Sequence, residues 1–132
     1  MDFNQINKVM KSLYLGEGIG EPTEVKGGLL HKMFRVDTTK GSYAVKVLNS
    51  EIMKRPTALN NTIHSEKIAA LFADSIPVIA ALTIDGKQIH EKDGCFYMVF
   101  NWIDGKSVFT PDISQRHCAT IGDILGKIFA IG

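Results

Sequence analysis

The segment SYAVKVLNS, residues 42–50, constrains the fold more than any other stretch of the chain. It is rich in β-branched and aromatic residues, which is typical of a strand whose successive side chains point to opposite faces. Both faces are apolar enough to be covered, so we expect a buried strand with other elements on either side. Only Lys46 breaks this pattern, because an ammonium group stands where a buried sheet would carry an aliphatic side chain. One face would carry Tyr43, Val45 and Val47, and the other Ala44, Lys46 and Leu48.

Turn signals divide the rest of the chain into short segments. Lys40-Gly41, Asp85-Gly86 and Asp93-Gly94 each separate runs of strand-forming residues, and Asp-Gly is a strong hairpin signal. Residues 49–61, broken by Pro56, are predicted to form a loop or a short irregular helix. The expected strands lie near residues 22–26, 31–38 and 42–50, with three further strand-like runs within 78–105.

Three segments show the apolar spacing of amphipathic helices. The first begins at Asp2, a good capping residue, and ends where the glycines start at Gly16. The second covers residues 60–75 and the third covers 111–132. The order of segments predicts an α+β fold, with about five antiparallel strands, one helix packed on them and a helix at each end. The apolar stripes are Phe3, Ile6, Val9, Met10 and Leu13; Ile63, Ile68, Leu71 and Phe72; and Ile121, Leu125, Ile128 and Phe129.

The composition excludes several classes of function. The 132 residues carry a net charge of +1 without a basic stripe, so counterion release favours no binding to nucleic acid. No apolar run is long enough to span a membrane, and the N-terminus lacks the pattern of a secretory signal. The two cysteines, Cys95 and Cys118, have no metal-binding spacing, and the four histidines are scattered. We therefore expect a cytoplasmic protein with no metal site in this chain.

The lysine of the central strand requires an explanation, because a buried ammonium group must find a partner or lose its charge. Glu66 lies near Ile63 on the predicted second helix, so it can approach Lys46 from the side that faces the sheet. A strand lysine held by a helix glutamate can contact the phosphates of a nucleotide. Ala44, on the same face, leaves room for a flat purine ring. The alternative is that Lys46 extends from an edge strand into water and Glu66 is an ordinary solvated charge.

Five motifs occur in order over nearly all of the chain from about residue 20 onward: GGLLHKMFRV, SYAVKVL, HSEKIAALF, IPVIAAL and DGCFYMVFNWIDG. Together they resemble the N-terminal lobe of the aminoglycoside phosphotransferase and choline kinase-like enzymes, which share a protein-kinase-like fold. The resemblance implies a kinase-like lobe over residues 1–100 and a hinge over 101–110. Residues 111–132 would then form the first helix of a truncated second lobe.

The resemblance also implies roles for individual residues. Lys46 would contact the nucleotide phosphates, and Glu66 would orient it. The Gly27-Gly28 turn would cover the nucleotide, although it lacks the full glycine pattern of protein kinases. The base would have Phe34 above it, room left by Ala44, Phe100 at the back, and the backbone of Asn101 and Ile103 along its edge.

Several of these positions also have purely structural interpretations. Phe34 suits a hydrophobic core, and Phe100 is interpreted as serving both the core and the pocket. Met33 needs no role beyond filling a gap in the packing. Trp102 suits plain packing between two lobes.

The function that the resemblance implies is a small-molecule kinase that uses ATP or GTP with Mg²⁺. It would transfer the γ-phosphate to a substrate hydroxyl, for example that of an aminoglycoside, choline or homoserine. The His-Gly-Asp segment, the downstream Asn and the metal-binding Asp of these enzymes do not occur before Gly132. We therefore assign no catalytic or metal-binding residue in this chain, and we expect it to be inactive alone.

Two other functions stay open. A kinase-like lobe without chemistry could bind a nucleotide or a protein partner, and an uncovered surface around its last helix would favour self-association. An unrelated α+β interaction domain could share the pattern by chance. A structure in which Lys46 and Glu66 do not approach each other would favour that last interpretation.

Overall fold

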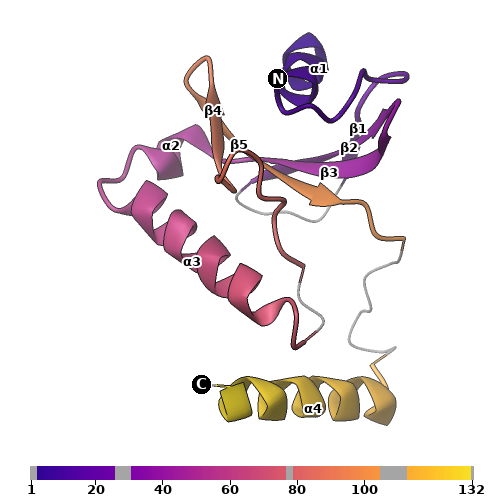
Figure 1. Cartoon of the computed structure of the whole chain (residues 1–132), viewed down its shortest axis with the longest axis vertical. Coiled ribbons are helices and arrows are strands. Elements are labelled where there is room, and N and C mark those ends of the chain that lie inside the picture. The colour runs from indigo at the N-terminus through magenta and orange to yellow at the C-terminus, as the bar shows by residue number, and fades with distance from the viewer. Residues whose placement is uncertain (1–2, 26–30, 77–78, 105–112, 132) are drawn as a thin grey trace.

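A computed structural model describes residues 3–25, 31–76, 79–104 and 113–131 (Figure 1). Five antiparallel strands form one sheet in the order β1-β2-β3-β5-β4, and helices lie on both sides of it. This arrangement confirms the predicted α+β fold. The strands are β1 (Thr23–Val25), β2 (Lys32–Thr38), β3 (Gly41–Val47), β4 (His90–Lys92) and β5 (Cys95–Asn101), and the helices are α1 (Phe3–Ser12), α2 (Ser50–Met53), α3 (Ala58–Phe72) and α4 (Gln115–Ile131).

The segment expected to give three strand-like runs gives two strands. The turn at Asp93-Gly94, where φ is 52° and 79°, joins β4 to β5 as a two-residue hairpin loop. The other turn, at Asp85-Gly86, is flanked by a single bridge between Ile84 and Lys87 and extends no further. Before it, the backbone N–H of Leu82 donates to the carbonyl of Val99 at 2.7 Å. The first run therefore lies along β5 without forming a regular strand.

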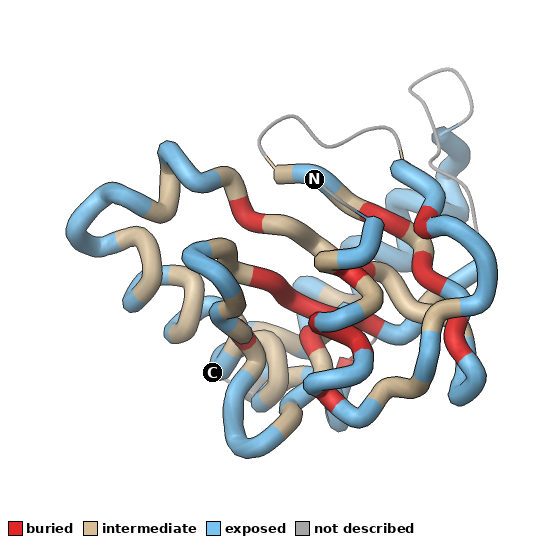
Figure 2. Tube along the Cα trace, turned by 90° about the horizontal axis from the view of Figure 1, so that it is seen from above, coloured by how far each residue is buried: buried red, intermediate tan, exposed pale blue. Residues whose placement is uncertain are grey.

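One face of the sheet packs against α1 and forms the larger core. The predicted stripe on α1 is confirmed at its centre, where Ile6, Val9 and Met10 are buried, whereas Phe3 stays exposed. Figure 2 shows the buried positions concentrated along the central strands. This first core consists of Ile6, Val9, Met10, Leu13, Phe34, Val36, Val45, Tyr97 and Val99.

The opposite face packs against α3 only in part. The apolar stripe predicted for this helix is wrong in its second half, because Ile68 and Leu71 are exposed. The helix runs away from the sheet along its length (Figure 1), so only its first turns reach the strands. It begins at Ala58, slightly earlier than expected, and α2 occupies the start of the predicted loop, capped by the Asn49 side chain. The second core contains Leu48, Ala81, Ile89, Met98 and Phe100, with Leu59 and Ile63 of α3 packed against it.

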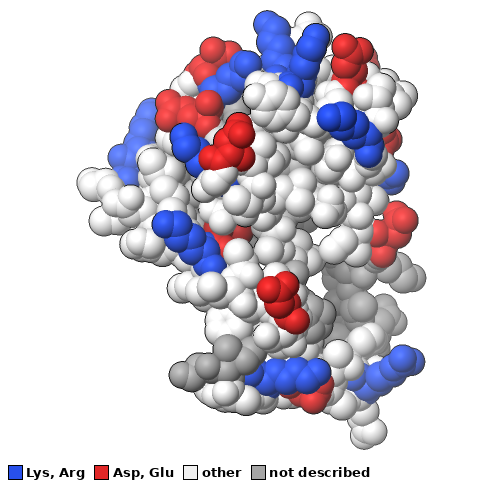
Figure 3. Space-filling model, viewed as in Figure 1, with Lys and Arg blue, Asp and Glu red and all other residues white. Residues whose placement is uncertain are grey.

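The last helix, α4, lies apart from the sheet (Figure 1). Its apolar side chains, including Ile121, Leu125 and Phe129, are exposed in this structure, and Phe129 is 82% exposed. Basic and acidic side chains are interspersed on the face drawn in Figure 3, which carries no basic stripe. Within the described part of the chain, no helix is long and apolar enough to cross a bilayer.

Candidate functional site

The sheet face that points away from α1 carries three of the predicted site residues, Ala44, Lys46 and Phe100. Because side chains alternate along a strand, Ala44 and Lys46 of β3 lie on this face together. Their cross-strand neighbours share it. The register aligns these neighbours in two rows, Arg35, Ala44 and Phe100 in one and Met33, Lys46 and Met98 in the next.

A cavity of about 190 Å³ opens on this face where β5 ends. Four of the residues that we expected around a base come together in its wall, where Ala44 of β3 meets Phe100, Asn101 and Ile103 at the end of β5. Most of the lining side chains are apolar, which suits a flat aromatic ring. The cavity is lined by Met33, Ala44, Ile79, Phe100, Asn101, Trp102 and Ile103.

Three residues of this wall were missed by the sequence reasoning. Met33 was interpreted as a gap filler, yet it is the cross-strand partner of Lys46 and lines the cavity. Trp102 follows the end of β5, and Ile79 precedes the irregular run along β5. The alternation along β2 contains a usable signal for Met33, because Arg35 and Asp37 alternate with the apolar Phe34 and Val36 and so place Met33 on the face away from the core.

Lys46 lies half-buried on the same face as this cavity, next to its lining residue Met33. Among the described residues, its ammonium group makes no hydrogen bond and no ion pair. The nearby His31 accepts a hydrogen bond at Nδ1 from the backbone N–H of Asn49 at 2.7 Å. Partial burial, and then the charge of Lys46, lower the pKa of His31. The imidazole is therefore neutral at pH 7, and Lys46 remains the positive group available to an anion.

Glu66 differs from its expected arrangement. It makes no ion pair with Lys46, and its Oε2 atom accepts a hydrogen bond from the backbone N–H of Ala81 at 3.5 Å. The divergence of α3 from the sheet accounts for this, because Glu66 follows the part of the helix that contacts the strands through Leu59 and Ile63. Taken alone, the missing pair would favour an unrelated domain.

Phe34 lies on the wrong face of the sheet for the expected contact with a base. It is only 4% exposed and belongs to the core beneath α1, whereas Ala44 points to the other side. A ring held over Ala44 therefore does not meet Phe34. The expected covering turn at Gly27-Gly28 lies outside the described residues.

A larger cavity of about 750 Å³ lies at the β4 edge of the sheet, between α1 and α3. Burial lowers the pKa of His90 and raises that of Tyr97, so both of these lining groups are neutral near pH 7. None of the residues expected to bind a nucleotide lines this cavity. We therefore place the candidate site in the smaller cavity, whose wall includes the neighbours of Lys46.

No group of three His, Cys, Asp or Glu side chains suited to a metal ion occurs within residues 3–25, 31–76, 79–104 and 113–131. In the comparisons with known proteins, a sequence profile described as the phosphotransferase enzyme family matches residues 21–131. This match spans the sheet, the cavity and the last helix. No curated protein matches the chain.

Proposed function

We propose that this chain, which belongs to the phosphotransferase enzyme family, provides the nucleotide-binding lobe of a small-molecule kinase. The kinase would transfer the γ-phosphate of ATP or GTP to a hydroxyl group of its substrate. The observation that carries this proposal is the apolar cavity on the same sheet face as Lys46, a lysine with no ion-pair partner among the described residues. Membership of the family also removes the reason to prefer an unrelated interaction domain.

The base would enter the cavity next to Ala44 and Phe100. The small side chain of Ala44 leaves the floor open, and Met33 and Ile79 offer apolar surface to an aromatic ring. Backbone groups of Asn101 and Ile103 would meet the edge of the base with hydrogen bonds. Backbone contacts of this kind are compatible with either adenine or guanine.

Lys46 would hold the phosphates, which have to be positioned and partly neutralised for transfer because the protein does little covalent chemistry in this reaction. Its ammonium group has no anionic partner within the described part of the chain, and its neighbour His31 is neutral, so Lys46 would offer its positive charge to a phosphate. Magnesium, when bound, neutralises charge on the nucleotide phosphates. The described residues offer no ligand set for it, and we assign it no step.

Glu66 would act after a movement of α3. In the present arrangement it accepts a hydrogen bond from Ala81, at a length of 3.5 Å that is easily given up. We propose that a bound nucleotide favours a state in which α3 swings toward the sheet and Glu66 pairs with Lys46. A ligand can shift such an equilibrium only by binding one state better than the other, and the paired state offers a better oriented lysine.

The acceptor is proposed only as a class, a metabolite or antibiotic with a reactive hydroxyl such as an aminoglycoside, choline or homoserine. We assign residues 1–100 to the lobe, 101–110 to the hinge and 111–132 to the start of a second lobe. The catalytic base and the metal ligands would belong to that second lobe, so this chain by itself would bind nucleotide without turning it over. We expect the reaction to take place in the cytoplasm.

A second candidate function rests on the exposed apolar side chains of α4. A helix that leaves Ile121, Leu125 and Phe129 uncovered favours contact with another apolar surface. The chain would then be a kinase-like module that binds a nucleotide or a protein without chemistry, and it would self-associate in isolation.

The proposed function is tested by titrating the 132-residue chain with ATP and with adenosine in a calorimeter. Lys46→Ala should weaken ATP binding at least about tenfold, because a charge-assisted contact contributes about 1.5–3 kcal/mol. Adenosine binding should stay unchanged. Lys32→Ala is the matched control, since Lys32 is an exposed lysine of the neighbouring strand that alternates onto the other face. Equal ATP affinity for the wild type and Lys46→Ala would refute the assignment.

A further inference from the structure

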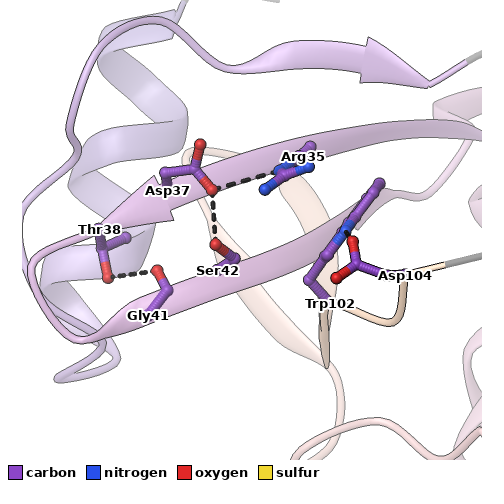
Figure 4. Close-up of polar contacts among 7 residues, drawn as sticks. All are labelled: Arg35, Asp37, Thr38, Gly41, Ser42, Trp102 and Asp104. Carbon is purple, nitrogen blue, oxygen red and sulfur yellow. Dashed lines mark hydrogen bonds and ion pairs between the residues drawn. The ribbon is translucent and has the colours of Figure 1, made fainter.

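A polar network crosses the sheet at the outer end of the cavity (Figure 4). It joins the second strand to the residues that follow β5. The guanidinium carbon of Arg35 lies 4.7 Å from the centre of the Trp102 ring, which is the distance of a cation–π contact. The indole Nε1–H donates to Oδ1 of Asp104 at 3.0 Å.

Arg35 is itself held in place. Its Nε–H donates to Oδ1 of Asp37 at 3.3 Å, and the same carboxylate oxygen accepts a hydrogen bond from the Ser42 hydroxyl at 2.7 Å. These hydrogen bonds lower the pKa of Asp37, with that from Ser42 the larger cause. The carboxylate is therefore ionised at neutral pH and keeps the guanidinium group oriented.

The geometry of the sheet explains how one side chain can reach so far. Arg35 is on β2 and Trp102 follows β5, so β3 lies between them. Neighbouring strands are about 4.8 Å apart, so the arginine side chain has to pass across β3 to reach the indole. The residues of β3 on that face that lie nearest to Arg35 are Ser42 and Ala44, and both are small enough to leave the path open.

A backbone hydrogen bond also fixes the position of Trp102. The N–H of Trp102 donates to the carbonyl of Ser42 at 3.1 Å, one step beyond the regular pairing of β3 with β5. Trp102 is thus held by its amide, by its ring face and by its indole N–H. Trp102 also lines the cavity, so this network determines where the cavity wall stands.

We propose that Arg35 is a positioning residue that, through Trp102, fixes the wall of the base-binding cavity before the nucleotide arrives. Arg35 does not line the cavity and acts on its wall only through Trp102. Asp37 and Ser42 act in turn only by holding Arg35. The part of this inference that concerns the nucleotide rests on the proposed function. The part that concerns Trp102 does not.

Two kinds of measurement on the 132-residue chain test the inference. Trp102 is the only tryptophan, so its emission spectrum reports the surroundings of this one indole. The exchange rate of its amide hydrogen, measured by NMR, reports the hydrogen bond to Ser42. Arg35→Gln should shift the emission and speed this exchange severalfold, and it should weaken adenosine binding about two- to fivefold, which is the scale of an exposed cation–π contact.

Three further variants sharpen the test. Arg35→Lys keeps the charge but loses the planar group, so it should recover part of each effect. Asp37→Asn should give the same changes at smaller size, because it frees the guanidinium group without removing it. Arg55→Gln, an exposed arginine whose side chain has no partner among the described residues, should leave all three readouts at their wild-type values.

The outcomes separate this inference from the proposed function. If the wild type binds neither adenosine nor ATP, the proposed function fails, and the exchange of the Trp102 amide still decides whether Arg35 holds the indole. If the wild type binds adenosine and Arg35→Gln binds it equally well, the positioning role is overturned. Unchanged emission and unchanged amide exchange in Arg35→Gln would overturn it as well.

Discussion

The two faces of the sheet use the same strands for different purposes. Beneath α1, alternate residues such as Val45 and Val99 are completely buried in a closed apolar core. On the other face, the residues between them leave a cavity at Ala44 and the ammonium group of Lys46, which has no ion-pair partner among the described residues. One face therefore forms the larger, closed core, and the other combines a smaller core with an open cavity. Because the side-chain period is two, the chain builds both faces from one set of strands.

The largest effect should come from disrupting the core beneath α1, on the closed face of the sheet. Ile6→Ala removes a fully buried side chain of α1 and leaves a cavity, which should lower the free energy of unfolding by about 2–5 kcal/mol. Ile68→Ala is the matched control on α3, where the same substitution at an exposed site should cost at most about 0.5 kcal/mol. Urea denaturation followed by circular dichroism measures both. Equal losses would mean that the two helices contribute alike.

The next largest effect should come from filling the cavity on the opposite, open face of the sheet. Ala44→Leu places a bulky side chain in the cavity, so adenosine affinity should fall by more than about tenfold, while the free energy of unfolding changes by less than about 1 kcal/mol. Its neighbour Val45 points into the closed core. Val45→Leu should therefore do the reverse, costing about 1–3 kcal/mol of stability and leaving the affinity intact. If Ala44→Leu and Val45→Leu changed adenosine affinity and the free energy of unfolding alike, the two faces would not have separate roles.

A smaller effect should distinguish the two phenylalanines that the sequence suggested for the base site. Phe34→Leu should lower stability by about 1 kcal/mol without altering adenosine affinity, because Phe34 lies beneath α1. Phe100→Leu should weaken adenosine binding, because Phe100 lines the cavity. Calorimetric titration of both variants gives the comparison. A loss of adenosine affinity in Phe34→Leu would contradict the placement of Phe34 outside the binding site.

The smallest effect should be a change with pH at the edge of the open face. The folded pKa of Asp37 is lowered from 3.8, so its contribution to the network is complete above that value and is lost as the pH falls through the lowered folded pKa. Trp102 emission should therefore stay constant from pH 7 to about pH 4 and change only below it. Asp37→Asn should make this acid transition smaller, and the part that remains belongs to Asp104, which accepts the indole N–H. A transition near pH 6 in the wild type would point to a histidine instead.

The elements of the fold were predictable because local patterns determine them. The alternation along residues 42–47, the Asp93-Gly94 turn and the stripe on α1 each act within a few residues, and the structure confirms them. The strand predicted over 42–50 ends earlier, at Val47, because Asn49 caps α2, which begins at Ser50. The stripe on α3 gave a wrong prediction of burial. An apolar spacing shows which residues share a side of a helix, but it does not show how far the helix follows the sheet. Ile68 and Leu71 lie in the part of the helix that leaves the sheet, and both are exposed.

The site was predictable only where register follows from alternation. Ala44 and Phe100 meet because β3 and β5 pair, and both were expected at the cavity. Phe34 was placed on the wrong face because its strand was not aligned residue by residue with β3. The contact between Arg35 and Trp102 joins residues on separate strands across a third, and no local pattern in the sequence encodes such a contact.

The most direct test of the central claim is to locate ATP on the protein by NMR. The ¹⁵N-labelled chain would be titrated with ATP and, separately, with adenosine, and the shifts of assigned amides compared. We expect Ala44, Asn101 and Ile103 to respond to both ligands and Lys46 to respond to ATP alone. Responses confined to His90 and Tyr97, in the larger cavity at the β4 edge, or no response to either ligand, would contradict a nucleotide site on the open face.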